Sequence, residues 1–354
     1  MKAWAVVAHG RPLECVDLPD LTPTGTQVIV RVTRCGVCHS DLHLWHGFYD
    51  LGGGRRLTVA ERGLTLPAAP GHEIVGRVVR MGPDAEGVAI GDARVVYPWI
   101  GCGTCARCLA GEDNLCTSQR SLGVSTDGGF ASEVIVPHPR YLFAFGGLDP
   151  SLAATYACSG LTAYGAVRKA LPLAPQEPVV VLGAGGLGIA GIATLRALGH
   201  ERIVAVDIGA DKRRAALEAG ASAAVDGAGP NVADRIREAA GGPIPAVIDF
   251  VGMSSTVETA YAILAKCGKL ILVGVGGGEL TVSVAGAIFR SLTIVGSLTG
   301  SLADLREVLD LAEAGRLRPI PINDAPVEAV NDVVLALERG AVTGRAVLVH
   351  AEDG

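Results

Sequence analysis

The sequence lacks the features that mark secreted, membrane-bound or nucleic-acid-binding proteins. Its first residues, MKAWAVVAHGRPLE, have neither the long apolar core nor the small-residue cleavage site of a secretory signal. It contains no run of like charges and no low-complexity tract, and its formal net charge of −6 does not provide the basic face that a nucleic-acid binder needs. We therefore expect a cytoplasmic protein with no nucleic-acid partner.

One apolar segment is nearly long enough to cross a membrane. Residues 178–195, PVVVLGAGGLGIAGIATL, carry no charge and are flanked by Glu177 and Arg196. A membrane helix of this length is conceivable, but the glycines are clustered in the middle of the segment. A buried strand, a glycine turn and a buried helix explain the pattern better, so we expect no contact with a membrane.

The overall composition is that of a folded, two-domain protein. The chain has 354 residues, of which 49% are hydrophobic and 19% are charged, and it contains 48 glycines. Such a composition is typical of soluble globular domains, and this length exceeds what one compact core usually accommodates.

Four of the nine cysteines lie close together, with the spacing C-x2-C-x2-C-x7-C. They are Cys102, Cys105, Cys108 and Cys116. In a reducing compartment this spacing favours metal binding over disulfides. Four thiolates form a closed tetrahedral site for which zinc is the redox-inert choice, and an iron–sulfur cluster is the alternative. Because a closed site leaves no position for a substrate, we interpret this site as structural.

Two other segments contain residues of the types that bind metals. RCGVCHSDLHLWHG spans residues 34–47, and APGHEIVG spans residues 69–76. Each is weak by itself, because a lone histidine or cysteine is more often a packed side chain than a ligand. Their combination with the cysteine loop is more specific.

The combined motifs resemble those of the zinc-dependent medium-chain alcohol dehydrogenases over essentially the whole chain. The resemblance is carried by CGVCHSDLH, GHE, the four-cysteine loop and YACSGLTAYGA. It implies that Cys38, His72 and Cys158 bind a catalytic zinc whose fourth position is open, the ligand set for which alcohol dehydrogenase is the standard example.

The resemblance also implies roles for residues around this zinc. Glu73 would lie beside the metal and act as a transient ligand, and Asp41 would orient His72. An alcohol gives up hydride once its oxygen carries negative charge, and a zinc ion of this kind lowers the pKa of bound water to about 7. Ser40 and His43 would then relay the released proton to solvent, although ordinary loop polarity also explains these two residues.

The three remaining cysteines are assigned to neither metal site. Cys15, Cys35 and Cys267 lie outside the metal-binding motifs. We expect all three to be buried structural thiols.

The segment VVVLGAGGLGIAGIATLRALG predicts a dinucleotide site. It has the pattern of a strand, a G-x-G-x-x-G turn and a helix, and it is followed by a second strand, RIVAVD, that ends in an acidic residue. The glycines allow the backbone to approach a pyrophosphate at a helix N-terminus, and the acidic residue binds the ribose hydroxyls. The residues expected at this site are Gly183, Gly185, Gly186, Leu187, Gly188 and Asp207. Because Asp207 would repel a 2′-phosphate, NAD is favoured over NADP.

The resemblance adds further cofactor contacts. It implies that His39 and Arg345 reach the pyrophosphate and that Val275 lies near the nicotinamide. Lys212 would flank the adenosine ribose, with a solvated helix face as an equal alternative.

The order of predicted elements defines two domains in an α/β fold. Strands at AAVD, AVIDFVG, KLILVGVGG and LTIVGS complete a six-stranded doubly wound parallel sheet of the Rossmann type. We assign residues 160–295 to this NAD-binding domain and residues 1–159 and 296–354 to a β-rich, GroES-like catalytic domain, which the tail rejoins through the helix NDVVLALERG and the strand AVLVH. The substrate should bind in the cleft between the domains.

The main departure from the family lies in residues 47–69. This connection is longer than usual and carries Arg55, Arg56 and Arg62. Structureless loops of this length are uncommon and often act as lids or binding loops. Two interpretations remain open here: a solvated surface insertion, or a contact with an acidic substrate or a second subunit.

Two tryptophans fall where family members line the substrate pocket. Trp45 and Trp99 would narrow the space around the metal and favour primary alcohols and aldehydes, including aromatic or allylic ones, over bulky secondary substrates.

The function expected is NAD-dependent, zinc-dependent, reversible oxidation of an alcohol to an aldehyde or ketone. One alternative is a specialised dehydrogenase of a larger cyclic or thioester-bearing hydroxy metabolite, and another is a metal-free reductase or non-enzymatic nucleotide-binding protein.

The chain lacks the long segment that dimeric animal members of the family carry after the cysteine loop. By this analogy we expect a homotetramer, with a dimer as the alternative.

Overall fold

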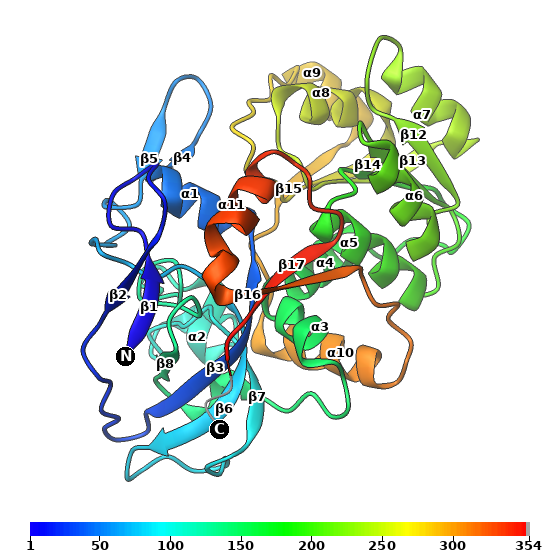
Figure 1. Ribbon diagram of the computed structural model, residues 1–354. Coiled ribbons are helices and arrows are strands. Elements are labelled where there is room, and N and C mark those ends of the chain that lie inside the picture. The colour runs from blue at the N-terminus through cyan, green and yellow to red at the C-terminus, as the bar shows by residue number, and fades with distance from the viewer. Residues whose placement is uncertain (352–354) are drawn as a thin grey trace.

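A six-stranded parallel sheet forms the centre of the lobe built from the middle of the chain (Figure 1). The computed structural model describes residues 1–351. The strand order, β12-β11-β10-β13-β14-β15, changes direction between β10 and β13, which is the doubly wound order. The strands are β10 (Val179–Leu182), β11 (Ile203–Asp207), β12 (Ala223–Asp226), β13 (Ile244–Asp249), β14 (Leu264–Leu272) and β15 (Thr293–Gly296).

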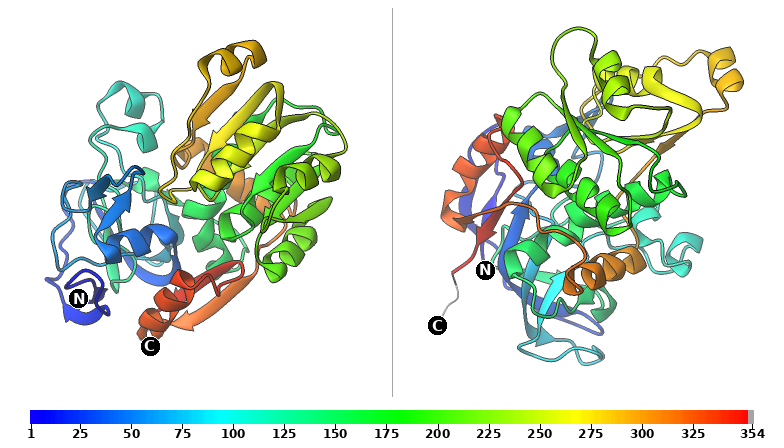
Figure 2. Two further views of the ribbon diagram at one scale, coloured as in Figure 1. Left: turned by 90° about the horizontal axis from the view of Figure 1, so that it is seen from above. Right: turned by 90° about the vertical axis from the view of Figure 1, so that its right-hand side faces the viewer.

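Helices cover both faces of this sheet (Figure 2). The strands near its centre are continuous apolar runs, such as the fully buried VVVL of β10, as expected for strands packed on both faces. One apolar core includes Ile189 and Ala216, and another includes Ile236 and Ala260. The helices are α5 (Gly186–Ala197), α6 (Ala210–Ala219), α7 (Val232–Ala240), α8 (Ser254–Ile263) and α9 (Val284–Arg290).

A mostly antiparallel seven-stranded sheet organises the other lobe. Its order is β16-β17-β3-β6-β7-β9, and β8 also pairs with β3. The chain's last strand, β17, pairs with β3, and β16 pairs with β17. The strands are β3 (Val28–Val37), β6 (Glu73–Met81), β7 (Ala93–Val96), β8 (Glu133–Val136), β9 (Leu142–Phe143), β16 (Ile322–Pro326) and β17 (Arg345–Val349). A separate ribbon is formed by β1 (Lys2–Ala5) and β2 (Glu14–Asp17).

Short helices complete this lobe and the junction with its neighbour. They are α1 (His39–His46), α2 (Ala106–Leu109), η1 (Asp113–Leu115), η2 (Pro139–Tyr141), α10 (Leu302–Glu313), η4 (Val327–Ala329) and α11 (Val330–Glu338).

A continuous helical segment connects the two lobes. It consists of α3 (Pro150–Thr155), the π-helical turn η3 (Tyr156–Gly160) and α4 (Leu161–Ala170). Helix α3 packs on β3 and β6, whereas α4 packs on α5. The π turn therefore lies where the lobes meet, and π turns inside helices often mark functional sites.

The apolar segment at residues 178–195 forms β10 and α5 rather than one long helix. Within residues 1–351, we find no helix with the length and apolar character needed to cross a membrane.

The prediction of three buried structural thiols is correct for one of them. Cys35 is buried in β3, but Cys15 and Cys267 are exposed. Cys15 lies on β2, which within residues 1–351 pairs with β1 alone and whose residues are all exposed or half-buried. Cys267 has a left-handed φ of 62° and lies in the part of β14 before its regular pairing with β13 begins at Lys269.

The long connection after α1 has regular structure at its centre. Strands β4 (Phe48–Asp50) and β5 (Arg56–Thr58) pair as an antiparallel hairpin, visible as the pale blue projection in Figure 1. The three arginines contact protein groups. The guanidinium carbon of Arg56 lies 3.9 Å from the Phe48 ring centroid, and that of Arg62 lies 5.0 Å from the Tyr49 centroid.

Candidate active site

Three potential metal ligands meet at the junction of the lobes. Cys38, His72 and Cys158 each offer one ligand atom, and these atoms all lie within 4.8 Å of one another. The three residues are 5%, 0% and 5% exposed. A cluster of two thiols and an imidazole, secluded from water, matches the donor set of a catalytic zinc site.

The local backbone explains this convergence. Strands β3 and β6 are neighbours, with Gly36 opposite Glu73, so the residues just beyond these positions, Cys38 and His72, come together. Gly71 has a φ of +95°, and a Cβ there would lie 2.6 Å from Cys35 Sγ. Only glycine fits this turn, which directs His72 inward. Cys158 enters from the π turn.

A buried carboxylate supports two of the ligands. Asp41 Oδ2 accepts a hydrogen bond of 2.8 Å from the Cys38 backbone N–H, and Oδ1 accepts one of 3.0 Å from Gly71. The same Oδ1 lies 3.3 Å from His72 Nδ1. Asp41 thus fixes the backbone on both sides of the cluster and faces the imidazole, as expected of a carboxylate that orients a metal-bound histidine.

The unpaired imidazole and the shared thiol proton of this cluster are consistent with binding of a metal cation. Neither ring nitrogen of the buried His72 forms a hydrogen bond with a group in residues 1–351, although buried polar atoms are usually paired. The Cys158 thiol donates toward Cys38, which lowers the pKa of Cys38 well below its usual value and raises that of Cys158. A metal ion would pair the imidazole nitrogen and displace the remaining thiol proton.

Glu73 is adjacent to the cluster but is not one of its members. Its carboxylate is fully buried and accepts hydrogen bonds from Arg345 Nε at 3.0 Å, from Arg345 Nη2 at 2.5 Å and from the Ser159 backbone N–H at 3.0 Å. The transient-ligand role of Glu73 therefore remains a prediction. Burial raises the pKa of Glu73, and the charge of Arg345 opposes that shift.

Arg345 connects the metal cluster with the glycine-rich turn. Its Nε and Nη2 bind Glu73, while its Nη1 would lie 3.4 Å from a Cβ built on Gly186. Gly186 is the first residue of α5. A buried cation therefore reaches from the metal side of the junction to a helix N-terminus, a place that favours anions.

The glycine-rich turn has the geometry of a phosphate cradle. Gly183 has a φ of +85°, and a Cβ on Gly188 would lie 1.8 Å from the Gly183 carbonyl oxygen, so neither position admits a side chain. A Cβ on Gly185 would meet nothing within 4 Å in the protein. The backbone is therefore open at the point where a pyrophosphate would approach. Leu187 follows in the first turn of α5.

The polar residues expected around the dinucleotide converge on this turn. Asp207 ends β11 and accepts hydrogen bonds of 2.8 Å from the N–H groups of Ala184 and Gly209. Burial lowers the pKa of His39, and the nearby charges of Arg345 and Lys212 lower it further. The pyrophosphate contact of His39 and the ribose contact of Lys212 remain predictions, with a solvated helix face as the equal alternative for Lys212.

The two relay residues lie on the first turns of α1. Ser40 Oγ is 3.9 Å from Cys38 Sγ. The His43 ring packs against the Tyr49 ring at a tilt of 34°, with centroids 4.6 Å apart, and burial lowers the pKa of His43. Sequence reasoning missed Tyr49, although an aromatic residue soon after the relay histidine was a signal for such a contact.

The two tryptophans occupy different environments. The Trp99 ring lies 5.4 Å from that of His72, and its Nε1 donates to the Ala157 carbonyl. Trp45 donates to the Arg11 carbonyl at 2.5 Å and packs in the lobe's core. Trp99 therefore borders the metal cluster directly, whereas a pocket role for Trp45 remains a prediction. Val275, which is 51% exposed, lies in the connection after β14, facing solvent.

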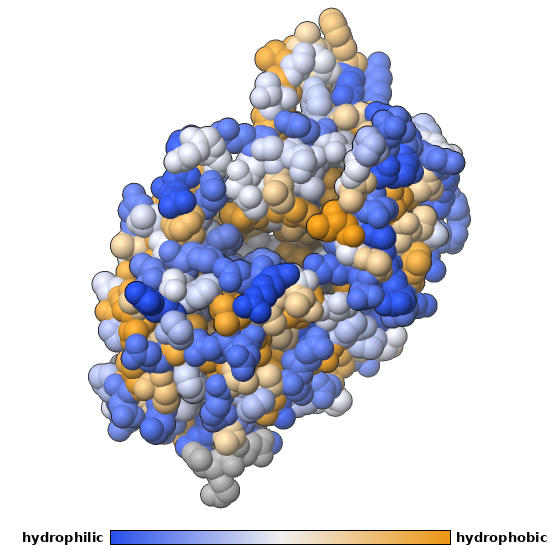
Figure 3. Space-filling view, turned by 45° about the horizontal axis from the view of Figure 1, so that its top comes forward, coloured by the Kyte–Doolittle hydropathy of each residue, from blue (hydrophilic) through white to orange (hydrophobic). Residues whose placement is uncertain are grey.

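The surface is hollowed between the lobes. Figure 3 shows this hollow, with hydrophobic residues on its walls and charged residues around its rim. A substrate that bridges the two lobes would lie there.

A second cysteine cluster lies in the loop between β7 and β8. Its ligand atoms all lie within 4.8 Å of one another, and the sulfurs of Cys105 and Cys108 are 3.5 Å apart, those of Cys105 and Cys116 3.8 Å, and those of Cys102 and Cys108 4.0 Å. Four Zn–S bonds of about 2.3 Å define a tetrahedron with edges of about 3.8 Å. Hydrogen bonds from Thr104 lower the pKa of Cys102 to about 6, which favours a thiolate.

Replacing Cys116 with serine should remove the zinc of this cluster and leave the other cluster intact. We expect the bound zinc to fall from two ions per chain to one, because three thiolates hold the ion far more weakly. The thermal transition should move to lower temperature, because structural zinc contributes directly to folding free energy. Elemental analysis and a thermal melt measure the two effects. Two retained ions would contradict the assignment.

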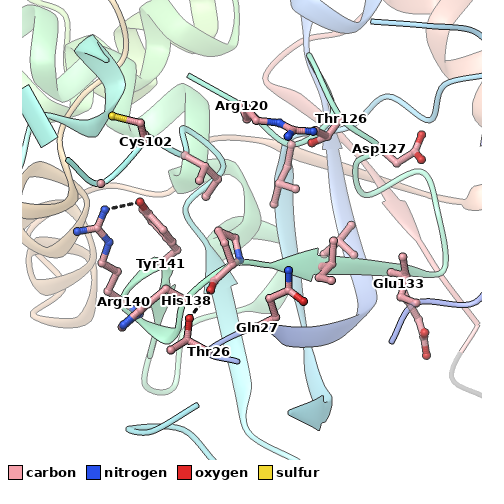
Figure 4. Close-up of a pocket in the computed structure, with 18 of the residues that line it drawn as sticks. Thr26, Gln27, Cys102, Arg120, Thr126, Asp127, Glu133, His138, Arg140 and Tyr141 are labelled. Atoms are coloured by element: carbon pink, nitrogen blue, oxygen red, sulfur yellow. Dashed lines mark hydrogen bonds between the residues drawn. The ribbon is translucent and has the colours of Figure 1, made fainter. Parts of the chain in front are cut away.

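A pocket of about 760 Å³ opens beside this loop (Figure 4). Two of its charged lining residues are paired with protein groups. Arg140 binds Asp113 at 2.6 Å, and Glu133 binds Arg80 at 2.5 Å. Among the predicted site residues, the lining includes Cys102 alone. We therefore place substrate binding in the hollow between the lobes rather than here.

Comparison with known proteins agrees with this architecture. Residues 24–145 match the model of the alcohol dehydrogenase GroES-like domain, and residues 186–314 match the zinc-binding dehydrogenase model. An NAD-dependent alcohol dehydrogenase of Sulfurisphaera tokodaii is 37% identical and covers 99% of this chain and 100% of its own. A D-arabinose 1-dehydrogenase (NADP(+)) of Saccharolobus solfataricus is 34% identical over 98% of this chain and 97% of its own.

The fold agrees equally well with a solved structure. The crystal structure of the alcohol dehydrogenase from Aeropyrum pernix superposes with a TM-score of 0.90 at 32% identity, over 99% of this chain and 100% of that one. Sequence identity at this level over full length, together with the two ligand clusters and the doubly wound sheet, assigns the chain to the zinc-dependent medium-chain alcohol dehydrogenase family.

Proposed function

We propose that this protein oxidises primary alcohols, including aromatic or allylic ones, reversibly to aldehydes with NAD as the hydride acceptor. The observation that carries the proposal is the position of Arg345, which joins the Cys38–His72–Cys158 cluster through Glu73 to the first residue of the glycine-rich helix. This junction brings a Lewis acid site and a dinucleotide site to one cleft, as hydride transfer between an alcohol and NAD requires.

Each group at the junction has a separable task. Cys38, His72 and Cys158 hold the catalytic zinc, and the four-cysteine cluster holds a structural one. A zinc ion held there would supply the Lewis acid that eases loss of the hydroxyl proton, and NAD bound at the glycine-rich turn would supply the hydride acceptor. The proton leaves through Ser40 and His43, so the alcohol loses one proton and one hydride for each NADH formed.

The position of Asp207 supports NAD as the cofactor. The S. tokodaii relative is named as NAD-dependent, whereas the D-arabinose relative is named for NADP(+). In this chain the carboxylate of Asp207 is held at the end of β11 by two backbone N–H groups. A fixed negative charge there binds ribose hydroxyls and repels a 2′-phosphate.

Replacing Asp207 with serine should shift the cofactor preference toward NADP. The change removes a charge repulsion of about 1 to 4 kcal/mol at close range, so the ratio of kcat/KM for NAD to that for NADP should fall by roughly tenfold or more. Paired steady-state assays of the two cofactors measure it. Wild-type protein that uses NADP at least as well as NAD would contradict the assignment.

The substrate class follows from the aromatic wall beside the metal. Trp99, whose ring lies 5.4 Å from that of His72, favours flat or unbranched substrates. A larger cyclic or thioester-bearing hydroxy metabolite is not favoured, since relatives that are 36–37% identical over their full length are named alcohol dehydrogenases. The complete ligand cluster also argues against a metal-free reductase or a non-enzymatic nucleotide-binding protein.

A substrate panel tests the proposal. NADH formation should be faster with primary aliphatic, benzylic and allylic alcohols than with branched secondary ones. Tight NADH binding without turnover of any simple alcohol would contradict the proposed substrate class.

The oligomeric state, location and domain limits complete the proposal. A homotetramer, or else a dimer, is supported by the open edge of β15, all of whose residues are exposed or half-buried, and by α9, on which Val284, Ile288 and Phe289 are 74%, 68% and 78% exposed. Such an apolar edge favours self-association. Sedimentation as a 36.2 kDa monomer would contradict this oligomeric state.

The proposal also includes a cytoplasmic location and domain limits at residues 159/160 and 295/296.

A further inference from the structure

We propose that the β4–β5 hairpin is a clasp between the two lobes that slows dinucleotide release. The proposal rests on the dinucleotide site described above. The hairpin belongs to the metal-binding lobe, and its tip touches Gly277 and Glu279 in residues 274–280, a part of the connection between β14 and α9 that also contains Val275.

The base of the hairpin is fixed to its own lobe. The Val59 N–H donates to the Gly47 carbonyl at 3.0 Å. Tyr49 is 9% exposed, and its ring packs against that of His43. The hairpin therefore moves with the relay and the metal cluster rather than as a free loop.

At the tip of the hairpin, a side chain of each lobe lies directly against the backbone of the other lobe. A Cβ on Gly52 would lie 2.4 Å from Glu279 Cγ, so the Glu279 side chain lies directly against the hairpin backbone. In return, a Cβ on Gly277 would lie 2.8 Å from Asp50 Cγ. Arg55 adds an ion pair of 3.5 Å with Glu279. The two lobes thus each insert an acidic side chain against a glycine of the other.

The opposing connection is held on its own side by hydrogen bonds. The Glu279 N–H donates to Ser254 Oγ at 3.0 Å, and the Gly278 N–H donates to the Gly252 carbonyl at 2.9 Å. Separating the lobes therefore breaks the tip contacts and leaves the connection intact. Because the Arg55 and Glu279 side chains are 72% and 54% exposed, their ion pair contributes little. The clasp depends on packing and can open reversibly.

This arrangement couples cofactor exchange to opening of the hairpin. A dinucleotide bound at the glycine-rich turn, with its nicotinamide near Val275, would be enclosed on one side by residues 274–280. Moving these residues away from the metal-binding lobe breaks the packing of Glu279 against Gly52. Loop or domain opening that precedes product release commonly limits turnover.

Replacing Gly52 with alanine tests the clasp, and the same change at Gly54 is a matched control. Both glycines have left-handed φ values, +79° and +74°, so both variants carry similar backbone strain. The added methyl group meets Glu279 in the first variant and nothing within 4 Å in the second. A Glu279→Ala variant removes the same contact from the other lobe without changing the hairpin.

The readout is the rate of NADH dissociation, followed by stopped-flow fluorescence after mixing the NADH complex of the zinc-loaded protein with excess NAD. Gly52→Ala and Glu279→Ala should each accelerate dissociation by roughly three- to tenfold, Gly54→Ala should leave it unchanged, and the double variant should not exceed the faster single one. Unchanged rates in Gly52→Ala and Glu279→Ala would overturn the clasp alone. Absence of NADH binding by the wild-type protein would overturn the proposed function together with it.

Discussion

Cys158→Ser should remove one zinc ion per chain and reduce alcohol turnover by roughly 10³-fold or more. The serine hydroxyl has nearly the volume of the thiol but is a poor zinc ligand at neutral pH, so the cluster of Cys38, His72 and Cys158 loses a donor. The Lewis acid contribution lost is worth several kcal/mol, and each 1.36 kcal/mol corresponds to tenfold in rate. Elemental analysis and initial rates of NADH formation measure both effects.

Cys35→Ser is the matched control for this experiment. Cys35 is 0% exposed, close to the cluster in β3, but its sulfur is not among the grouped ligand atoms. This variant should keep two zinc ions and most of the turnover, and both variants should still bind NADH because the glycine-rich turn is unchanged. Turnover within tenfold of wild type in Cys158→Ser would contradict the assigned ligand set.

Arg345→Met should destabilise the protein and weaken NADH binding for two separable reasons. The first is that it leaves the buried Glu73 carboxylate without its cation, which costs about 3 to 5 kcal/mol. The second is that it removes a positive charge facing Gly186 at the start of α5, so the Kd for NADH should rise roughly tenfold or more, the usual worth of a charged hydrogen bond.

The double variant Arg345→Met/Glu73→Gln separates the two effects. The amide oxygen of the glutamine still accepts the hydrogen bond from the Ser159 N–H, and the unpaired charge is gone. The temperature of unfolding should therefore recover most of its loss, whereas the Kd for NADH should stay high. If the Kd for NADH also returned to the wild-type value, Arg345 would affect NADH binding only through the stability of the protein.

Much of this arrangement could be predicted from local patterns. The strand–glycine–helix segment around Gly183 predicts its own geometry, because the turn requires residues without side chains. The four-cysteine spacing predicts its cluster for a similar reason, since short gaps force neighbouring thiols toward one centre. In both cases the residues that form the site are close together in the sequence.

Contacts between distant segments could not be predicted in the same way. The pairing of Glu73 with Arg345 joins residues far apart in the chain, and the resemblance alone implied only that Arg345 reaches the pyrophosphate. The connection at residues 47–69, which contains the hairpin, was expected to contact solvent, a substrate or a subunit. Its contact with Glu279 depends on how the two lobes meet, which no local pattern encodes. The exposure of Cys15 and Cys267 likewise depends on strand pairing.

The central claim is direct hydride transfer from an alcohol to NAD in the cleft between the lobes. The most direct measurement is mass spectrometry of the NADH formed when the zinc-loaded protein reacts with NAD and a primary alcohol fully deuterated at its carbinol carbon. The proposed function predicts one deuterium in each NADH molecule, and none in the NADH formed from the unlabelled alcohol in deuterated water. NADH that carries solvent hydrogen in place of the alcohol's deuterium would contradict it.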